Sequence, residues 1–138
     1  MNLTALIADN ITDVLVKIIR FTRIRQKVLT RNINCATRRD YIPYDLPVKE
    51  FCTALDRAVA EHVRRGRLLL RDSGNVAFEP GGDFRVEPVV DRFAAELLKR
   101  DVDRYLELQL NKLMENALNQ RIAAELLRYK RGLASIFE

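Results

Sequence analysis

The chain contains few of the residues from which metal and redox sites are usually built. Its 138 residues include one histidine, two cysteines and no tryptophan. A zinc site needs three or four Cys, His or carboxylate ligands at recognisable spacings, and Cys35, Cys52 and His62 do not form such a set. We expect His62 to be a structural residue on a helix surface, and the two cysteines to be small residues that are buried or half-buried.

Glycine and proline are also scarce, at five and four residues. No phosphate-binding loop or G-x-G-x-x-G sequence is present, and Gly81 and Gly82 indicate only a turn. No nucleophile motif accompanies His62. The carboxylates lie among Lys and Arg, as on ordinary helix surfaces. We find no catalytic constellation, so we predict that the protein is not an enzyme and that it needs no cofactor.

Long apolar runs are absent as well. No stretch approaches the roughly 20 apolar residues of a membrane-spanning helix. The first eight residues carry no basic side chain, and Asp9 and Asp13 interrupt the apolar stretch, which is unlike a secretory signal. We therefore expect synthesis in the cytoplasm and no direct insertion into a membrane.

The net charge of +5 leaves two interpretations open. A basic surface can bind nucleic acid, and the densest basic cluster is Arg64, Arg65, Arg67 and Arg71. This cluster lacks the interleaved aromatic residues of a single-strand binding platform, and acidic residues are interleaved through most of the chain. We favour a solvated basic face and expect no nucleic-acid partner.

The sequence is rich in amphipathic helical pattern, first near its N-terminus. Apolar residues recur there at steps of mostly three and four, with Lys and Arg on the other side. No Gly or Pro occurs before Pro43. The pattern predicts one helix over roughly residues 5–33, with Asn10 or Thr12 as its N-cap. Its apolar stripe consists of Ile11, Val14, Leu15, Ile18, Phe21, Ile24 and Val28.

A second long pattern occupies the C-terminal part. Between Pro88 and Gly132 there is neither Gly nor Pro. A break is expected near the sequence KRDVD, where Asp101 or Asp103 makes a good N-cap, and the last helix should run from about 102 to 136. Its apolar stripe consists of Leu106, Leu110, Leu113, Ala117, Ile122, Leu126 and Tyr129, and continues through Leu133 and Ile136.

The middle of the chain is mixed. Pro47 is a suitable first residue for a shorter helix that Gly66 ends, with a stripe of Val48, Phe51, Leu55, Val59 and Val63. Residues 68–87 predict a β-hairpin, with its turn at Asp72–Asn75, or an irregular loop. We therefore divide the chain into an N-terminal helix (1–35), a variable middle (36–101) and a C-terminal helix (102–138). The predicted fold is mainly α, with the terminal helices packed as a coiled-coil-like pair.

Two long apolar stripes need cover, because burial stabilises a helix more than propensity does. A two-helix pair leaves much of that surface in water, at a cost of about 25 cal/mol per Å². Either the middle folds back as a third layer or other subunits supply the cover. We favour assembly, and we predict that the interface consists of Ile11, Val14, Ile18, Phe21, Val28, Leu110, Leu113, Ala117, Ile122, Leu126, Tyr129, Leu133 and Ile136.

Two segments resemble the rod-protein family of the bacterial flagellar basal body. After its first helix that family typically has L-x-x-N-I-A-N-x-x-T-P-G-Y-x-x-x-D, whereas Cys35 stands at the second Asn and Arg38-Arg39-Asp40 replaces Thr-Pro-Gly. Near the C-terminus the chain is similar to the family's E-N-x-L segment and its final G-L-x-x-I. The matching residues are Leu29, Asn32, Ile33, Tyr41, Asp45, Glu115, Asn116, Leu118, Leu126, Leu127, Lys130, Gly132, Leu133 and Ile136.

The resemblance implies a structural subunit of the proximal rod, which crosses the periplasm. It implies export by the flagellar type III apparatus without a cleaved signal. The implied partners are other rod subunits, the adaptor between rod and export gate, and the export machinery itself. Such subunits carry a Phe-x-x-x-apolar gate motif, which Phe51 and Leu55 fit. Phe93 and Leu97 fit it too, and both pairs also suit an ordinary helix core at positions i and i+4.

Two other functions stay open from the sequence. A self-contained cytoplasmic helical regulator or chaperone-like protein would bury its stripes within one chain. A nucleic-acid-binding protein would use the arginine cluster and would bind in a salt-dependent manner. If the rod interpretation is correct, we expect the terminal helices to be partly disordered before assembly and to fold when a partner covers them.

Overall fold

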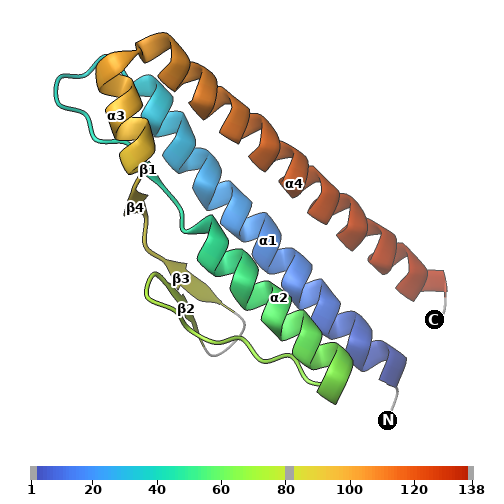
Figure 1. Cartoon of the computed structure of the whole chain (residues 1–138). Coiled ribbons are helices and arrows are strands. Elements are labelled where there is room, and N and C mark those ends of the chain that lie inside the picture. Colours follow the sequence, from blue (N-terminus) through green and yellow to red (C-terminus); the bar gives the residue numbers. More distant parts are fainter. Residues whose placement is uncertain (1–2, 80–82, 137–138) are drawn as a thin grey trace.

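The computed structural model describes residues 3–79 and 83–136, and their side chains between residues 10 and 133 (Figure 1). The described chain is mainly helical, as predicted. Its helices are α1 (Leu3–Asn34), α2 (Val48–Arg65), α3 (Arg92–Arg100) and α4 (Val102–Ile136). The strands within the described residues are short, namely β1 (Tyr44–Asp45), β2 (Val76–Phe78), β3 (Phe84–Val86) and β4 (Val89–Val90).

The long helices α1 and α4 run antiparallel along one another, and α1 lies between α4 and α2 (Figure 1). The strands form two antiparallel pairs rather than one sheet. In the first pair, β1 lies beside β4, which ties the segment after α1 to the segment before α3. In the second, β2 lies beside β3 next to α2. No helix in this described part is both long and apolar enough to cross a membrane.

The main core lies between α1, α2 and the β2–β3 pair. The ring of Phe21 stacks on that of Phe51 with centroids 4.0 Å apart, and Phe51 lies 5.3 Å from Phe84. These rings bring a helix, a second helix and a strand pair together around one aromatic cluster. Its buried members are Val14, Phe21, Leu46, Phe51, Leu55, Val76 and Phe84.

A smaller cluster joins α1 to α4. Leu15 packs against Ala123 and Leu127, with Ile18 and Ile19 at its edge. Since α1 contributes to both clusters, it is covered on two sides. The helix α4 contacts α1 with one side only, so apolar side chains on the rest of α4 stay exposed.

The predicted helix ends are partly right. The break at KRDVD is confirmed, because Asp101 separates α3 from α4 and its carboxylate accepts from the backbone nitrogen of Arg104 at 3.2 Å. Gly66 ends α2 in the left-handed conformation with φ 76°, as predicted. The predicted cap at Asn10 or Thr12 is wrong, because α1 begins at Leu3. The preceding segment 3–8 is rich in the helix formers Leu and Ala, so it extends the helix.

Two predictions for the middle segment are also wrong. The helix α2 buries Phe51, Leu55 and Ala58, whereas Val59 is exposed and Val63 is 80% exposed. The core therefore lies along the first part of the predicted stripe only. The turn at 72–75 does not join the paired strands, because β2 starts at Val76 and its partner β3 follows residues 79–83.

Candidate assembly interface

Asn32, near the end of α1, lies at the centre of a buried hydrogen-bond cluster. Its side chain is only 1% exposed. Its Nδ2 donates to the backbone oxygen of Tyr44 at 2.7 Å and to Oε1 of Gln109 at 3.0 Å. Its Oδ1 accepts from the Tyr41 hydroxyl at 2.8 Å and from the backbone nitrogen of Tyr44 at 3.2 Å. The amide thus uses its full bonding capacity to join α1, β1 and α4.

Two residues of α4 complete this cluster. The hydroxyl of Tyr105 donates to the backbone oxygen of Asn32 at 2.9 Å, and burial raises the pKa of Tyr105. Gln109 is fully buried, and its Nε2 has no hydrogen-bond partner among the described residues. An unpaired buried donor costs about 1–3 kcal/mol. The hydrogen bonds of Asn32, Tyr105 and Gln109 therefore define the register of α4 on α1, although the unpaired Nε2 of Gln109 reduces the stability that they provide.

Four charged side chains form a second group beside the first, which we call the charge quartet: Arg25, Asp45, Asp91 and Lys112. Arg25 binds Asp45 through two hydrogen bonds, from Nε at 2.9 Å and from Nη2 at 3.0 Å. Lys112 of α4 donates to Asp45 at 3.0 Å and to Asp91 at 2.6 Å. Asp91 also caps α3 by accepting from the backbone nitrogen of Ala94. The quartet therefore links α1, β1, α3 and α4.

The surroundings favour the ionised forms of Asp45 and Lys112. Burial alone would raise the pKa of Asp45, but the hydrogen bonds and charge of Arg25, with help from Lys112, hold it below its ordinary value. Burial alone would lower the pKa of Lys112, but the hydrogen bond to Asp91 and the charge of Asp45 raise it above its ordinary value. Two positive and two negative charges balance at neutral pH, which limits the cost of their burial.

The side of α4 that faces α1 continues beyond the quartet. Asn116 is buried and donates to the backbone oxygen of Thr22 at 2.7 Å. The next contacts with α1 are apolar and are made by Ala123 and Leu127. We call this set of six the inner seam of α4: Tyr105, Gln109, Lys112, Asn116, Ala123 and Leu127. It is polar in its first half and apolar in its second.

Away from the inner seam, α4 exposes a ridge of apolar side chains, which lies between exposed polar residues such as Glu115, Arg121 and Glu125. Its side chains range from 37% exposed at Leu133 to 70% at Met114, with Tyr129 at 66%. A line of exposed apolar side chains of this length is a candidate interaction site. We call it the outer face, and it consists of Leu110, Met114, Leu118, Ile122, Leu126, Tyr129 and Leu133.

The outer face does not run straight along the helix. From Leu110 to Leu126 its members follow one another at steps of four, and each step turns the position by about 40° around the axis. The side chains thus form a ridge of the i±4 kind. Two such ridges pack at an angle of about 50°, so a partner helix should cross α4 obliquely.

The predicted interface residues have different positions in the structure. The α4 members Leu110, Ala117, Ile122, Leu126, Tyr129 and Leu133 are exposed and Leu113 is half-buried, whereas the side chain of Ile136 lies outside the described residues. Of the five predicted residues on α1, Ile11 alone is exposed. Val14 and Phe21 are wrongly predicted as interface residues, because they belong to the main core of their own chain, and the half-buried Ile18 and Val28 pack against it.

The residues that gave the resemblance to the rod-protein motif divide in the same way. Leu29 is fully buried, Asn32 and Asp45 hold the two polar clusters, and Asn116 lies on the inner seam. Tyr41 bonds Asn32 and has a pKa raised by burial. Leu127 also lies on the inner seam. Of the other matching residues with described side chains, Ile33 and Lys130 are half-buried, and Glu115, Leu118, Leu126, Gly132 and Leu133 are exposed.

The turn within the motif has an informative backbone. Asp40 stands where the family has glycine, and its φ is 57°. Glycine adopts this left-handed conformation freely, and Asp and Asn are among the few other residues that tolerate it. The replaced turn therefore has a conformation that a glycine would favour.

Other candidate residues occupy ordinary structural positions. Phe51 and Leu55 of the predicted export-gate motif are buried in the main core, whereas Phe93 of the second match is 63% exposed. His62 is half-buried, and its Nδ1 lies 3.3 Å from Nδ2 of Asn10. Cys35 is buried and Cys52 exposed, and both are free thiols. The described residues contain no group of three or more His, Cys, Asp or Glu that could hold a metal ion.

Sequence reasoning missed Arg25, Gln109, Lys112 and Asp91 as partners of the motif residues. Each lies in a helical pattern or at a helix end, where a polar residue looks like part of a solvated surface. The available signal was position, since Gln109 and Lys112 lie seven and four residues before Asn116 on the same helix side. Comparison with protein-family models, with curated proteins and with solved structures found no match.

Replacing Asn32 with Asp should destabilise the fold by about 2–4 kcal/mol, because the carboxylate cannot donate to Tyr44 and Gln109. Urea unfolding measures the loss. The control Asn119→Asp changes an exposed residue of α4 in the same chemical way and should shift the free energy of unfolding by less than about 0.5 kcal/mol. Equal effects of the two changes would contradict the role of the Asn32 cluster.

Replacing Asp45 with Asn should cost on the order of 2–4 kcal/mol at neutral pH, because Arg25 and Lys112 lose their shared carboxylate. The pKa of Asp45 is lower in the folded chain than its ordinary value of 3.8. Its contribution is therefore present above that value and is lost as the pH falls through the folded pKa. The difference between the two proteins in urea unfolding should shrink below about pH 3.8. Asp56→Asn, at an exposed position of α2, should show no such difference at any pH.

Replacing Asp40 with Gly should stabilise the protein by about 0.5–1 kcal/mol, because glycine adopts the left-handed conformation without steric cost. Thermal and urea unfolding measure the gain. Arg39→Gly in the same turn introduces the same flexibility at a residue that does not have a positive φ, and should instead be neutral or destabilising. A gain at Arg39 as large as that at Asp40 would contradict this account of the turn.

Proposed function

We propose that the protein is a structural subunit that assembles with neighbouring subunits through the outer face of α4. The observation that carries this proposal is the continuous exposed ridge from Leu110 to Leu133, on a helix whose opposite side is held by α1. Covering each half-exposed side chain would contribute roughly 1 kcal/mol. The ridge as a whole can therefore support a stable contact between subunits.

We further propose that the assembly is the proximal rod of the bacterial flagellar basal body. The motif resemblance supports this, and so does the positive φ of Asp40 at the glycine position of the motif. In this proposal the subunit is exported by the flagellar type III apparatus and lies in the periplasm-spanning rod. It contacts other rod subunits and the adaptor to the export gate, and it acts without catalysis or cofactor.

In this proposal the terminal helices α1 and α4 act together as one coiled-coil-like unit, since the residues of the inner seam follow one another mostly at steps of three and four. Its polar half fixes the register, and the outer face is left to the neighbour. Export would require the chain to be unfolded, because Phe51 and Leu55 are accessible to a gate receptor only when the main core is open.

A self-contained helical regulator is the second candidate. The observation that favours it is the main core, which α1, α2 and the β2–β3 pair complete within one chain. A regulator of this kind would remain monomeric at high concentration and would stay in the cytoplasm. The test of assembly therefore distinguishes the two functions.

The double change Leu118→Asp and Ile122→Asp should abolish self-association and leave the fold intact, because both side chains are about half exposed. Sedimentation velocity over a range of concentrations measures association, and circular dichroism measures the fold. Val63→Asp introduces a carboxylate at another exposed apolar position, on α2, and should associate like the parent. Association of the double variant equal to that of the parent would contradict an interface on α4.

The flagellar assignment needs a separate measurement. A tagged copy expressed in its own bacterium should be retained in detergent-extracted basal bodies, and the double variant should be lost from them. Recovery of the parent protein only in the soluble cytoplasmic fraction would overturn the rod assignment. The assembly interface would then be judged from sedimentation alone.

A further inference from the structure

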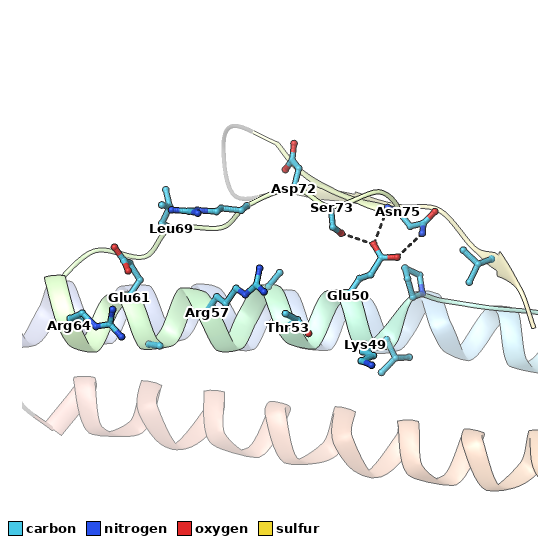
Figure 2. Close-up of a pocket in the computed structure, with 16 residues that line it drawn as sticks. Lys49, Glu50, Thr53, Arg57, Glu61, Arg64, Leu69, Asp72, Ser73 and Asn75 are labelled. Atoms are coloured by element: carbon cyan, nitrogen blue, oxygen red, sulfur yellow. Dashed lines mark hydrogen bonds between the residues drawn. The ribbon is translucent and has the colours of Figure 1, made fainter.

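A groove separates α2 from the segment 67–75 that follows it, at a distance from the outer face of α4 (Figure 2). Its volume is about 780 Å³. Apolar side chains line part of it, namely Val48, Ala54, Ala60, Leu69 and Val89. Figure 2 shows Arg57 and Glu61 extending from α2 toward the segment. The groove therefore combines charged side chains with an apolar lining.

The acidic side chains that line the groove are already occupied. Glu50 accepts from Oγ of Ser73 at 2.6 Å and from Nδ2 of Asn75 at 2.7 Å, and these hydrogen bonds lower its pKa. Asp72 accepts from the backbone nitrogen of Phe78 at 2.8 Å. Glu61 pairs with Arg65, which lies outside the groove, at 3.4 Å.

The basic side chains of the groove have no such partners. Lys49, Arg57, Arg64 and Arg71 line it, and none of them forms an ion pair within the described residues. Four unpaired cations thus stand against three engaged carboxylates. The groove has a local positive charge that a ligand with carboxylates would complement.

The segment 67–71 also offers unpaired backbone groups. Leu68 and Leu70 pack against the main core, whereas Leu69 lines the groove. This alternation is typical of a strand with one covered face. Within the described part of the chain, no hydrogen bond reaches the backbone of these three residues. An extended segment with unpaired backbone groups is a template for adding a strand.

We propose that this groove binds an extended acidic peptide of a partner protein, which adds as a strand to residues 67–71 and directs its carboxylates at Arg57, Arg64 and Arg71. Backbone hydrogen bonds would supply affinity, and the alternate side chains of the peptide would supply specificity. Since Leu69 and Arg71 both line the groove, the set of peptide side chains on that side would carry the carboxylates. This proposal does not depend on assembly through α4.

The composition of the groove favours a peptide over a nucleic acid. No aromatic side chain lines it, so bases would have no surface on which to stack. The carboxylates of Glu50, Glu61 and Asp72 would also repel a row of phosphates. A peptide with spaced carboxylates can avoid these groups and still reach the arginines.

The binding test uses the full-length protein and a peptide of alternating valine and glutamate, about ten residues long, with an uncharged fluorophore. Fluorescence anisotropy should show saturable binding. Arg57→Glu should weaken it about tenfold, whereas Arg57→Lys should keep most of it. Arg121→Glu makes the same charge change on α4 and should alter the affinity less than twofold. Binding that Arg57→Glu leaves unchanged, or equal binding of a valine–lysine peptide, would overturn the proposal.

Hydrogen exchange measures the binding mode. The amides of residues 68–70 should exchange several-fold more slowly when the peptide is bound, and unchanged exchange would overturn strand addition. Two results would overturn the peptide proposal and assign the groove to another occupant. The first is that a single-stranded oligonucleotide binds more tightly than the peptide and that Arg57→Glu abolishes this binding. The second is that the protein self-associates without peptide and that Arg57→Glu abolishes this association. The variant Leu118→Asp and Ile122→Asp should bind the peptide normally, which separates this test from that of the assembly interface.

Discussion

The position of α4 depends on one carboxylate, that of Asp45. It accepts two hydrogen bonds from Arg25 and one from Lys112, and Lys112 reaches on to the cap of α3 at Asp91. A shift of α4 by one turn would carry Lys112 about 5.4 Å away and would leave buried charges unpaired. The inner seam therefore has one favourable register, and that register directs the apolar ridge of α4 away from the rest of the chain.

The two sides of α4 show why an apolar pattern alone was a poor guide to its packing. The inner seam contains the polar residues Gln109, Lys112 and Asn116, whereas large apolar residues such as Met114 and Leu118 are exposed. The partners of these buried polar groups include residues 22, 32 and 45, which are distant in sequence, so local periodicity cannot reveal them. The result is a helix that buries several polar side chains and exposes several large apolar ones, whereas an ordinary surface helix buries its apolar stripe.

The sequence predicted the features that depend on local chemistry. The existence and type of the helices, the break at Asp101 and the end of α2 at Gly66 all follow from propensity, capping and backbone freedom. The sequence did not predict the location of the core. The apolar residues Val14 and Phe21 show the same sequence pattern whether another subunit or Phe51 of the same chain covers them. The motif residues were found, but their function as buried hydrogen-bond centres required Tyr44 and Gln109 to be placed in space.

The order of the elements along the chain has a consequence for folding. The main core uses residues between Val14 and Val86 only, so it can close before α4 has been synthesised. The contacts of α4 join residues far apart in sequence, such as Thr22 with Asn116, and closing so long a loop carries an entropic cost and is slow. We expect α4 to dock last, on a surface that is already formed. Until then the chain exposes both sides of its longest helix, and that interval is when a chaperone or a neighbouring subunit would have most access to it.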